Sequence, residues 1–95
     1  MTVEELRVEL EKIISDLTST GFTSIDSGIL EKLEKFAAIA DELDMNEGKR
    51  LIENLSGAMK AIQAGKSKVD SGTIRLTALD FYVKKLSGSG NIEDL

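Results

Sequence analysis

The sequence contains no cysteine, histidine, proline or tryptophan, and its only aromatic residues are three Phe and one Tyr. Without Cys, the chain can form no disulfide and has no thiol nucleophile; without His, it has no imidazole base. The two commonest zinc ligands are therefore both missing. A calcium or magnesium site made of carboxylates alone stays open. The core must be built mainly from aliphatic side chains.

The sequence also lacks a long apolar run and a cluster of basic residues. A membrane-spanning helix needs about 20 mostly apolar residues, and residues 1–12 are too charged for a signal peptide. The 12 Lys and Arg are scattered among 17 Asp and Glu, and the formal net charge is −5. Because nucleic acids and anionic membranes attract clustered positive charge, neither is expected as a partner. We expect a soluble, cytoplasmic protein.

Apolar residues recur at helical spacing in four segments. We predict helices between Thr2 and Gly21, over residues 27–43, between Asn46 and Gly65, and over residues 71–86. The first three segments each place their apolar residues on one stripe, which is typical of a helix with a single buried face. These stripes are Val3, Leu6, Leu10, Ile13, Ile14 and Leu17; Leu30, Leu33, Phe36, Ala37, Ala40 and Leu43; and Leu51, Ile52, Leu55, Ala58, Met59 and Ile62.

The connections between these segments are short, and short connections force neighbouring helices to run antiparallel. The predicted fold is an all-α, four-helix antiparallel up-and-down bundle made of two helical hairpins. Residues 1–87 form its single domain. Residues 88–95 are predicted to be a flexible linker and an acidic tail, because Gly and Ser alternate over residues 87–90 and Asp and Glu follow.

Two connections have the same helix-ending and helix-starting residues: residues 21–28 and 65–72 both begin with Gly and end with Asp-Ser-Gly. A Gly after the last helical residue ends a helix by adopting a left-handed conformation, and an Asp before the next helix caps it. Thr2 and Glu5 have the spacing of a capping box. The residues predicted to cap helices are Thr2, Asp26, Asp44 and Asp70.

No pattern in the chain predicts catalysis or a bound cofactor. The densest acidic cluster (Asp41, Glu42, Asp44 and Glu47) lacks the spacing of a calcium-binding loop, so helix ends and caps explain it better. Most other carboxylates lie beside Lys or Arg at helical spacing, as in surface ion pairs. We expect no catalytic, cofactor-binding or metal-binding residues, and therefore a protein that is not an enzyme.

The fourth segment carries more apolar surface than one buried face requires. Its apolar residues cover about 220° of arc, whereas a stripe of about 100–140° is enough for a helix in a bundle. A surplus of this kind indicates either a central helix or a surface that contacts another chain. We predict an interaction surface here; the alternative is that the same residues cover the open end of the bundle. The predicted residues are Leu76, Tyr82 and Val83 of this segment, together with Phe22 on the first loop.

A stretch of the chain resembles a helical accessory region found beside SWIM zinc fingers in bacterial proteins. The resemblance is carried by Gly21-Phe22, Ile25-Asp26, residues 30–33, Ala37, Ala40-Asp41, residues 43–45, Gly48 and residues 51–55, and it extends to Val69-Asp70. The SWIM motif itself needs Cys and His ligands, which this chain lacks, so no zinc-binding residue carries over. The resemblance implies an accessory helical module.

The leading hypothesis is a non-enzymatic module that binds a protein partner or a second copy of itself. A bundle like the histidine phosphotransfer domain is an alternative. It would be inactive in phosphotransfer, because the phosphoacceptor His is absent. A structural domain of a larger assembly also remains possible, and the linker favours it. A carboxylate-metal or ligand-binding protein is the alternative from another class, and it would need polar residues on the inward stripes.

Overall fold

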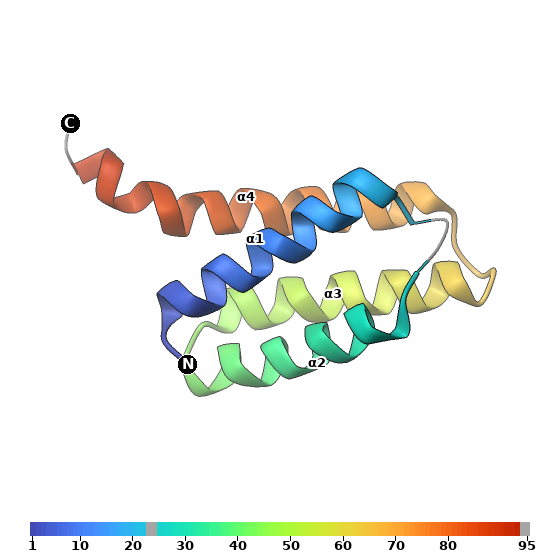
Figure 1. Cartoon of the computed structure of the whole chain (residues 1–95), viewed down its shortest axis with the longest axis horizontal. Coiled ribbons are helices and arrows are strands. Elements are labelled where there is room, and N and C mark those ends of the chain that lie inside the picture. The colour runs from blue at the N-terminus through green and yellow to red at the C-terminus, as the bar shows by residue number, and fades with distance from the viewer. Residues whose placement is uncertain (23–24, 94–95) are drawn as a thin grey trace.

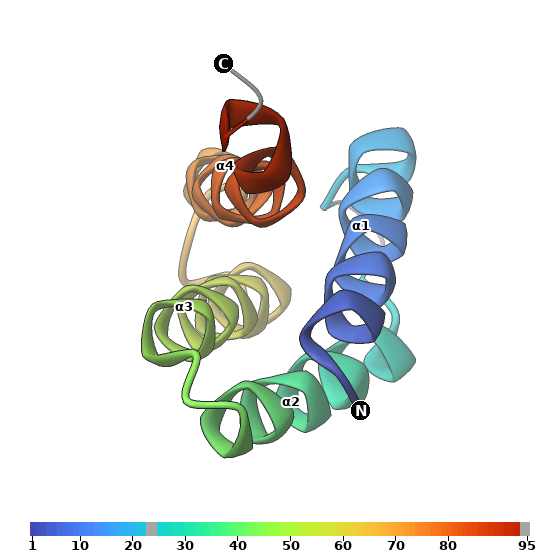
Figure 2. The ribbon, with the colours of Figure 1, turned by 90° about the vertical axis from the view of Figure 1, so that its left-hand side faces the viewer.

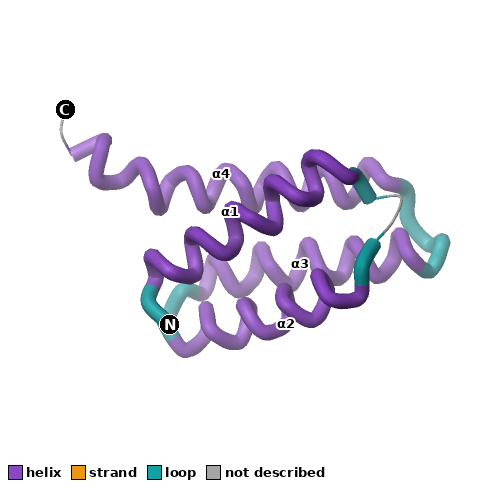
Figure 3. Tube along the Cα trace, in the orientation of Figure 1, coloured by secondary structure: helices purple, strands orange, loops and turns teal. Residues whose placement is uncertain are grey.

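The computed structural model describes residues 1–22 and 25–93, and of residues 87–93 it describes the backbone. Within this part the chain forms four helices and no strand: α1 (Val3–Thr20), α2 (Ser27–Glu42), α3 (Asn46–Gln63) and α4 (Val69–Glu93). Figures 1 and 3 show consecutive helices running in opposite directions and joined by short loops. The predicted four-helix antiparallel bundle is therefore confirmed.

The starts of α1 and α2 follow from the two predicted caps. Thr2 accepts a hydrogen bond from the Glu5 backbone N–H at 3.1 Å, and the Glu5 carboxylate accepts one from the Thr2 N–H at 2.9 Å. These two bonds form the predicted capping box. The hydrogen bond that the Thr2 backbone N–H donates to the Glu5 carboxylate is the main cause that holds the pKa of this carboxyl below its ordinary value, and the Thr2 side chain adds to the effect. Asp26 accepts from the Gly28 N–H at 2.9 Å at the start of α2. Both caps are confirmed.

The predicted caps at Asp44 and Asp70 are wrong. The residue preceding α3 is Met45, and no side-chain hydrogen bond caps this end of the helix within the described residues. Asp44 instead adopts a left-handed conformation, with φ of 59°, and lies just beyond the end of α2. Asp70 lies inside the first turn of α4, because that helix begins at Val69 rather than residue 71. A carboxylate there favours the helix dipole without being the cap.

The ends of α2 and α3 share one hydrogen-bonding arrangement. At the end of α2, the Met45 N–H donates to the Ala40 carbonyl at 2.8 Å and the Asp44 N–H donates to the Asp41 carbonyl at 3.1 Å. At the end of α3, Lys66 and Gly65 donate to the Ala61 and Ile62 carbonyls at 2.8 and 3.0 Å, and φ of Gly65 is 76°. Both ends are Schellman motifs, which satisfy carbonyls that the helix leaves open.

Two of the predicted loop positions and the end of the predicted tail lie outside the described residues, namely Thr23, Ser24, Asp94 and Leu95. The backbone of α4 continues as a helix to Glu93, past the Gly-Ser run where we predicted a linker. The division of the chain at residues 87 and 88 stays a prediction.

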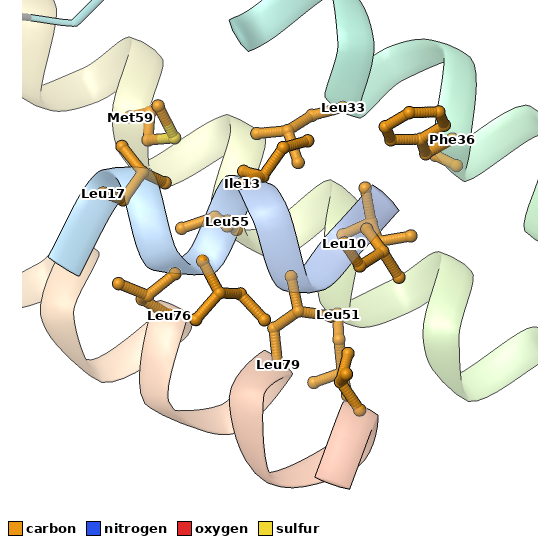
Figure 4. Packing of buried hydrophobic residues seen from close by; sticks show 14 of the residues in the cluster. Leu10, Ile13, Leu17, Leu33, Phe36, Leu51, Leu55, Met59, Leu76 and Leu79 are labelled. Atoms are coloured by element: carbon orange, nitrogen blue, oxygen red, sulfur yellow. The ribbon is translucent and has the colours of Figure 1, made fainter. Parts of the chain in front are cut away.

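The four helices form a ring around one core. Viewed along the bundle, α2 lies beside α3, α3 lies beside α4, and α1 lies between α2 and α4 and closes the ring (Figure 2). All four helices and the first loop contribute buried apolar side chains to a single cluster. Figure 4 shows leucines of α1, α2, α3 and α4 pointing toward one another inside the ring. The stripes predicted for the first three helices supply most of this core. The exceptions are Val3, which is 41% exposed, and Leu30, Leu43, Ala58 and Ile62, which are partly buried.

Candidate functional site

The carboxylates lie mainly on the surface of the helices. Within the described residues, no group of three or more of them is placed to hold a metal ion. In the acidic cluster predicted from the sequence, Asp41 pairs with Lys49 at 3.5 Å and Glu47 pairs with Arg50 at 2.5 Å, both on the surface. These carboxylates act as ordinary surface ion-pair partners, each pair contributing roughly 0–1 kcal/mol.

A shallow hollow lies between α2 and α3, with Ser56 among its lining residues. Ser56 is 6% exposed, and its hydroxyl has no hydrogen-bond partner among the described residues. The rim carries the Glu34–Lys60 ion pair, whose side chains are both more than half exposed. A small-molecule site usually brings several polar groups together inside an enclosed pocket. Besides Ser56 and the exposed ion pair, the exposed Glu53 lines the hollow, and these groups surround an open hollow rather than an enclosed pocket.

The structure buries three of the four residues that the sequence analysis assigned to an interaction surface. Phe22 is 4% exposed, Leu76 is 7% exposed and Val83 is fully buried. Figure 4 shows Leu76 on the core side of α4, facing Leu17 and Leu55. Their predicted exposure is therefore wrong: these side chains belong to the core.

Phe22 is buried against α4 at Gly72, where the helix has no side chain. A Cβ atom built on Gly72 would lie 2.9 Å from Phe22 Cδ1 and 2.9 Å from Ile62 Cδ1. The absence of a side chain at Gly72 therefore lets the Phe22 ring lie directly on α4, beside the end of α3. The contact closes this end of the bundle.

Tyr82 is half-buried at the seam between α3 and α4. A Cβ atom on Gly48 would lie 3.0 Å from Tyr82 Cε2, so the ring rests on the backbone of the first turn of α3. Burial raises the pKa of the Tyr82 phenol above its ordinary value. The Gly48 backbone N–H opposes this rise, and the Glu47 carboxylate adds to it. The role of Tyr82 within the described residues is to join two helices.

The apolar surplus of α4 lies on the side of the helix that faces away from the bundle. Ile74 is 65% exposed and Phe81 is 64% exposed, the two highest values among the large apolar side chains of the described residues. At 100° per residue, both lie nearly opposite the buried Leu79 and Val83. Ala78, also exposed, lies between them, and Asp70 and Lys85 mark the two ends of the same row. We call this row the outer stripe: Asp70, Ile74, Ala78, Phe81 and Lys85.

The outer stripe is narrow and ordered along the helix. Its five residues fall within about 80° of arc and span about 22 Å along the axis. The Lys85 ammonium lies 5.5 Å from the centre of the Phe81 ring, within range of a cation–π contact. In Figure 2, α3 lies below α4 and α1 lies to its right, and no helix covers the opposite, left-hand side of α4. Helix α4 is thus apolar on two opposite faces, only one of which the bundle uses.

The apolar arc of this helix predicted an exposed surface correctly, but the residues assigned to that surface lay at the wrong edge of the arc. The arc of about 220° runs from Phe81 and Ile74 at one edge to Val83 and Leu76 at the other. A glycine inside a helix often marks close packing, and Gly72 lies on the same side of the helix as Leu76 and Val83. Reading Gly72 as a packing position would have assigned Ile74 and Phe81 to the surface.

The other exposed large apolar side chains lie elsewhere on the surface. Met1 is 52% exposed and lines a hollow with Val8 among glutamates of α1, Val3 is 41% exposed, and Val69 is 39% exposed at the start of α4. Scattered exposed apolar residues are normal on protein surfaces. The outer stripe differs because its apolar residues follow one another at helical spacing.

No family model, curated protein or solved structure matches this chain. The resemblance to the helical region beside SWIM zinc fingers therefore stays a prediction. Among the described helices, none combines the length and the apolar character that crossing a membrane requires.

Proposed function

We propose that this chain is a non-enzymatic interaction module that binds a protein partner through the outer stripe of α4. The observation that carries the proposal is the two-faced character of α4. Its buried face completes the core, whereas Ile74 and Phe81 on the opposite face remain about two-thirds exposed.

A partner that covered this face would remove exposed apolar surface from water. Full burial of an Ile or Phe side chain is worth about 1.5–3 kcal/mol. Covering the exposed two-thirds of Ile74 and Phe81 would therefore contribute about 1–2 kcal/mol each. Charged Asp70 and Lys85 at the two ends would orient the partner. A row with successive spacings of four, four, three and four residues fits another helix laid alongside.

A binding site for a small ligand inside the bundle has less support. It would need polar groups on the inward faces, and Ser56 is the one polar residue buried among those the structure describes. Its hydroxyl lies beside an open hollow with an exposed ion pair at its rim. The outer stripe is therefore the better supported site.

A photoreactive side chain at position 81 tests the proposal. The full chain with p-benzoylphenylalanine in place of Phe81 is expressed in cells that naturally make the protein and is then irradiated. The same residue at Ser15, an exposed position of α1, is the matched control. We expect a protein adduct from position 81 and none from position 15. No adduct from position 81, or the same adducts from both positions, would show that the outer stripe does not bind a protein.

A further inference from the structure

We infer that the partner of the outer stripe is a second copy of this chain, packed antiparallel so that the α4 helices of the two copies lie side by side. This inference rests on the proposed function and names the partner. The order of residue types along the stripe makes it complementary to a second copy of itself.

The outer stripe is symmetric about one point on α4. The midpoint between Asp70 and Lys85 falls between residues 77 and 78, and the midpoint between Ile74 and Phe81 falls at the same place. When two copies of such a helix pack antiparallel about that point, residue 74 of one copy meets residue 81 of the other. Both copies then contribute the same surface patch, as a two-fold interface requires.

The charges at the two ends of the stripe make this pairing self-complementary. In the antiparallel arrangement Asp70 of each copy meets Lys85 of the other, so the interface carries two opposite-charge pairs. In a parallel arrangement Asp70 would meet Asp70 and Lys85 would meet Lys85. Like charges placed together disfavour a pairing, so the charges select the antiparallel dimer.

The middle of the stripe suits close approach of two helices. Thr77 and Ala78 lie on either side of the symmetry point, and both are exposed. Small residues at the crossing point allow the larger Ile74 and Phe81 to interlock on either side. Lys85 already lies over the Phe81 ring of its own chain, which places its charge beside the apolar contact.

The contact is limited to one helix from each copy, so we expect a weak dimer. An interface made by one helix face from each copy buries little surface, and interfaces that bury little surface belong to the class that forms transient complexes. Sedimentation equilibrium on the full chain should therefore cover concentrations up to about 1 mM, a range that detects even a dissociation constant near the weak end of specific binding. We expect a monomer–dimer equilibrium, and we expect Phe81→Glu to abolish it. Because Phe81 is exposed, this substitution leaves the core intact, which circular dichroism can verify.

Charge reversal tests the antiparallel pairing directly. Asp70→Lys and Lys85→Asp should each weaken self-association about threefold or more, because each replaces two attractive pairs by two repulsive ones. An equimolar mixture of the two variants should regain dimerisation, since the Lys pair of one chain then faces the Asp pair of the other. The double variant Asp70→Lys/Lys85→Asp should also regain it. Lys32→Asp, an exposed charge change on α2, is the control and should leave self-association unchanged.

The outcomes separate this inference from the proposed function. A wild-type chain that stays monomeric up to about 1 mM, or variants whose mixture dimerises no better than either alone, would overturn the second-copy inference. The proposed function would survive that result if position 81 still gives a specific adduct with a different protein. A position-81 adduct with twice the mass of the chain would support both.

Discussion

Two glycines inside helices have opposite surroundings, although both positions read alike in the sequence. At Gly72 a Cβ atom would lie 2.9 Å from the Phe22 ring, and Phe22 is 4% exposed and held by the core. At Gly57 nothing lies within 4 Å of the position that a Cβ atom would occupy. Helical propensity favours Ala over Gly by about 1 kcal/mol at both positions. Packing alone therefore separates them.

We expect Gly72→Ala to destabilise the protein and Gly57→Ala to stabilise it. The new methyl at position 72 overpacks the contact with Phe22, which costs about 1–3 kcal/mol and outweighs the gain in propensity. We expect a net loss of about 1 kcal/mol at position 72 and a gain of about 1 kcal/mol at position 57. Urea unfolding of the two variants measures both free energies. If both variants were stabilised, Phe22 would not be held against α4 as described.

At the scale of the helix, α2 and α3 end with the same hydrogen bonds but with different residues in the left-handed position. Asp44 ends α2 with φ of 59°, and Gly65 ends α3 with φ of 76°. A left-handed backbone costs a residue with a Cβ atom about 1–2 kcal/mol, and glycine avoids this cost. The end of α2 is thus the less stable of the two for a local backbone reason.

We expect Asp44→Gly to raise the free energy of unfolding by roughly 0.5–1 kcal/mol, because Asp tolerates this conformation better than most residues but less well than Gly. The matched control is Gly65→Ala, which should lower the free energy of unfolding by about 1 kcal/mol. Thermal and urea unfolding measure both changes. A destabilised Asp44→Gly variant would mean that the Asp44 side chain stabilises the turn, against the geometry described here.

At the scale of the whole molecule, sequence periodicity predicted the four helices and most of the core. It succeeded for α1, α2 and α3 because each has one apolar stripe, and only one packing orientation buries a single stripe. It could not orient α4, whose broad arc allows several orientations. The orientation depends on Gly72, Phe22 and Ile62, which lie far apart in the sequence and meet only after folding. The caps at Thr2 and Asp26 were predictable for the opposite reason, since all their partners are local.

The same limit applies to the candidate site. That α4 carries surplus apolar surface could be predicted from composition and spacing. Which of its residues form that surface depends on the side from which α1 and α3 approach (Figure 2). Leu76 and Val83 were therefore misassigned to the surface, whereas Ile74 and Phe81 were part of the arc but were not selected.

The Tyr82 phenol, at the seam between α3 and α4, makes the free energy of unfolding of the whole bundle depend on pH in the alkaline range. Burial raises the pKa of the Tyr82 phenol, so the unfolded chain releases the phenolic proton at a lower pH than the folded chain does. Above the pKa of the unfolded chain, the unfolded state binds fewer protons, and the free energy of unfolding falls as pH rises. The contribution of Tyr82 is fully present below that pKa and is lost as pH rises through the pKa of the folded chain.

Because the chain has one Tyr and no Trp, this titration can be followed without interference from other residues. We expect the tyrosinate absorbance of the folded protein to appear at a higher pH than in urea-unfolded protein. We also expect Tyr82→Phe to lose less stability than wild type over that pH range. Lysines titrate in the same range, and this variant keeps all of them, so the difference between the two proteins isolates the phenol. Equal titration midpoints in folded and unfolded protein would mean that the Tyr82 ring does not lie against Gly48 and does not join α3 to α4.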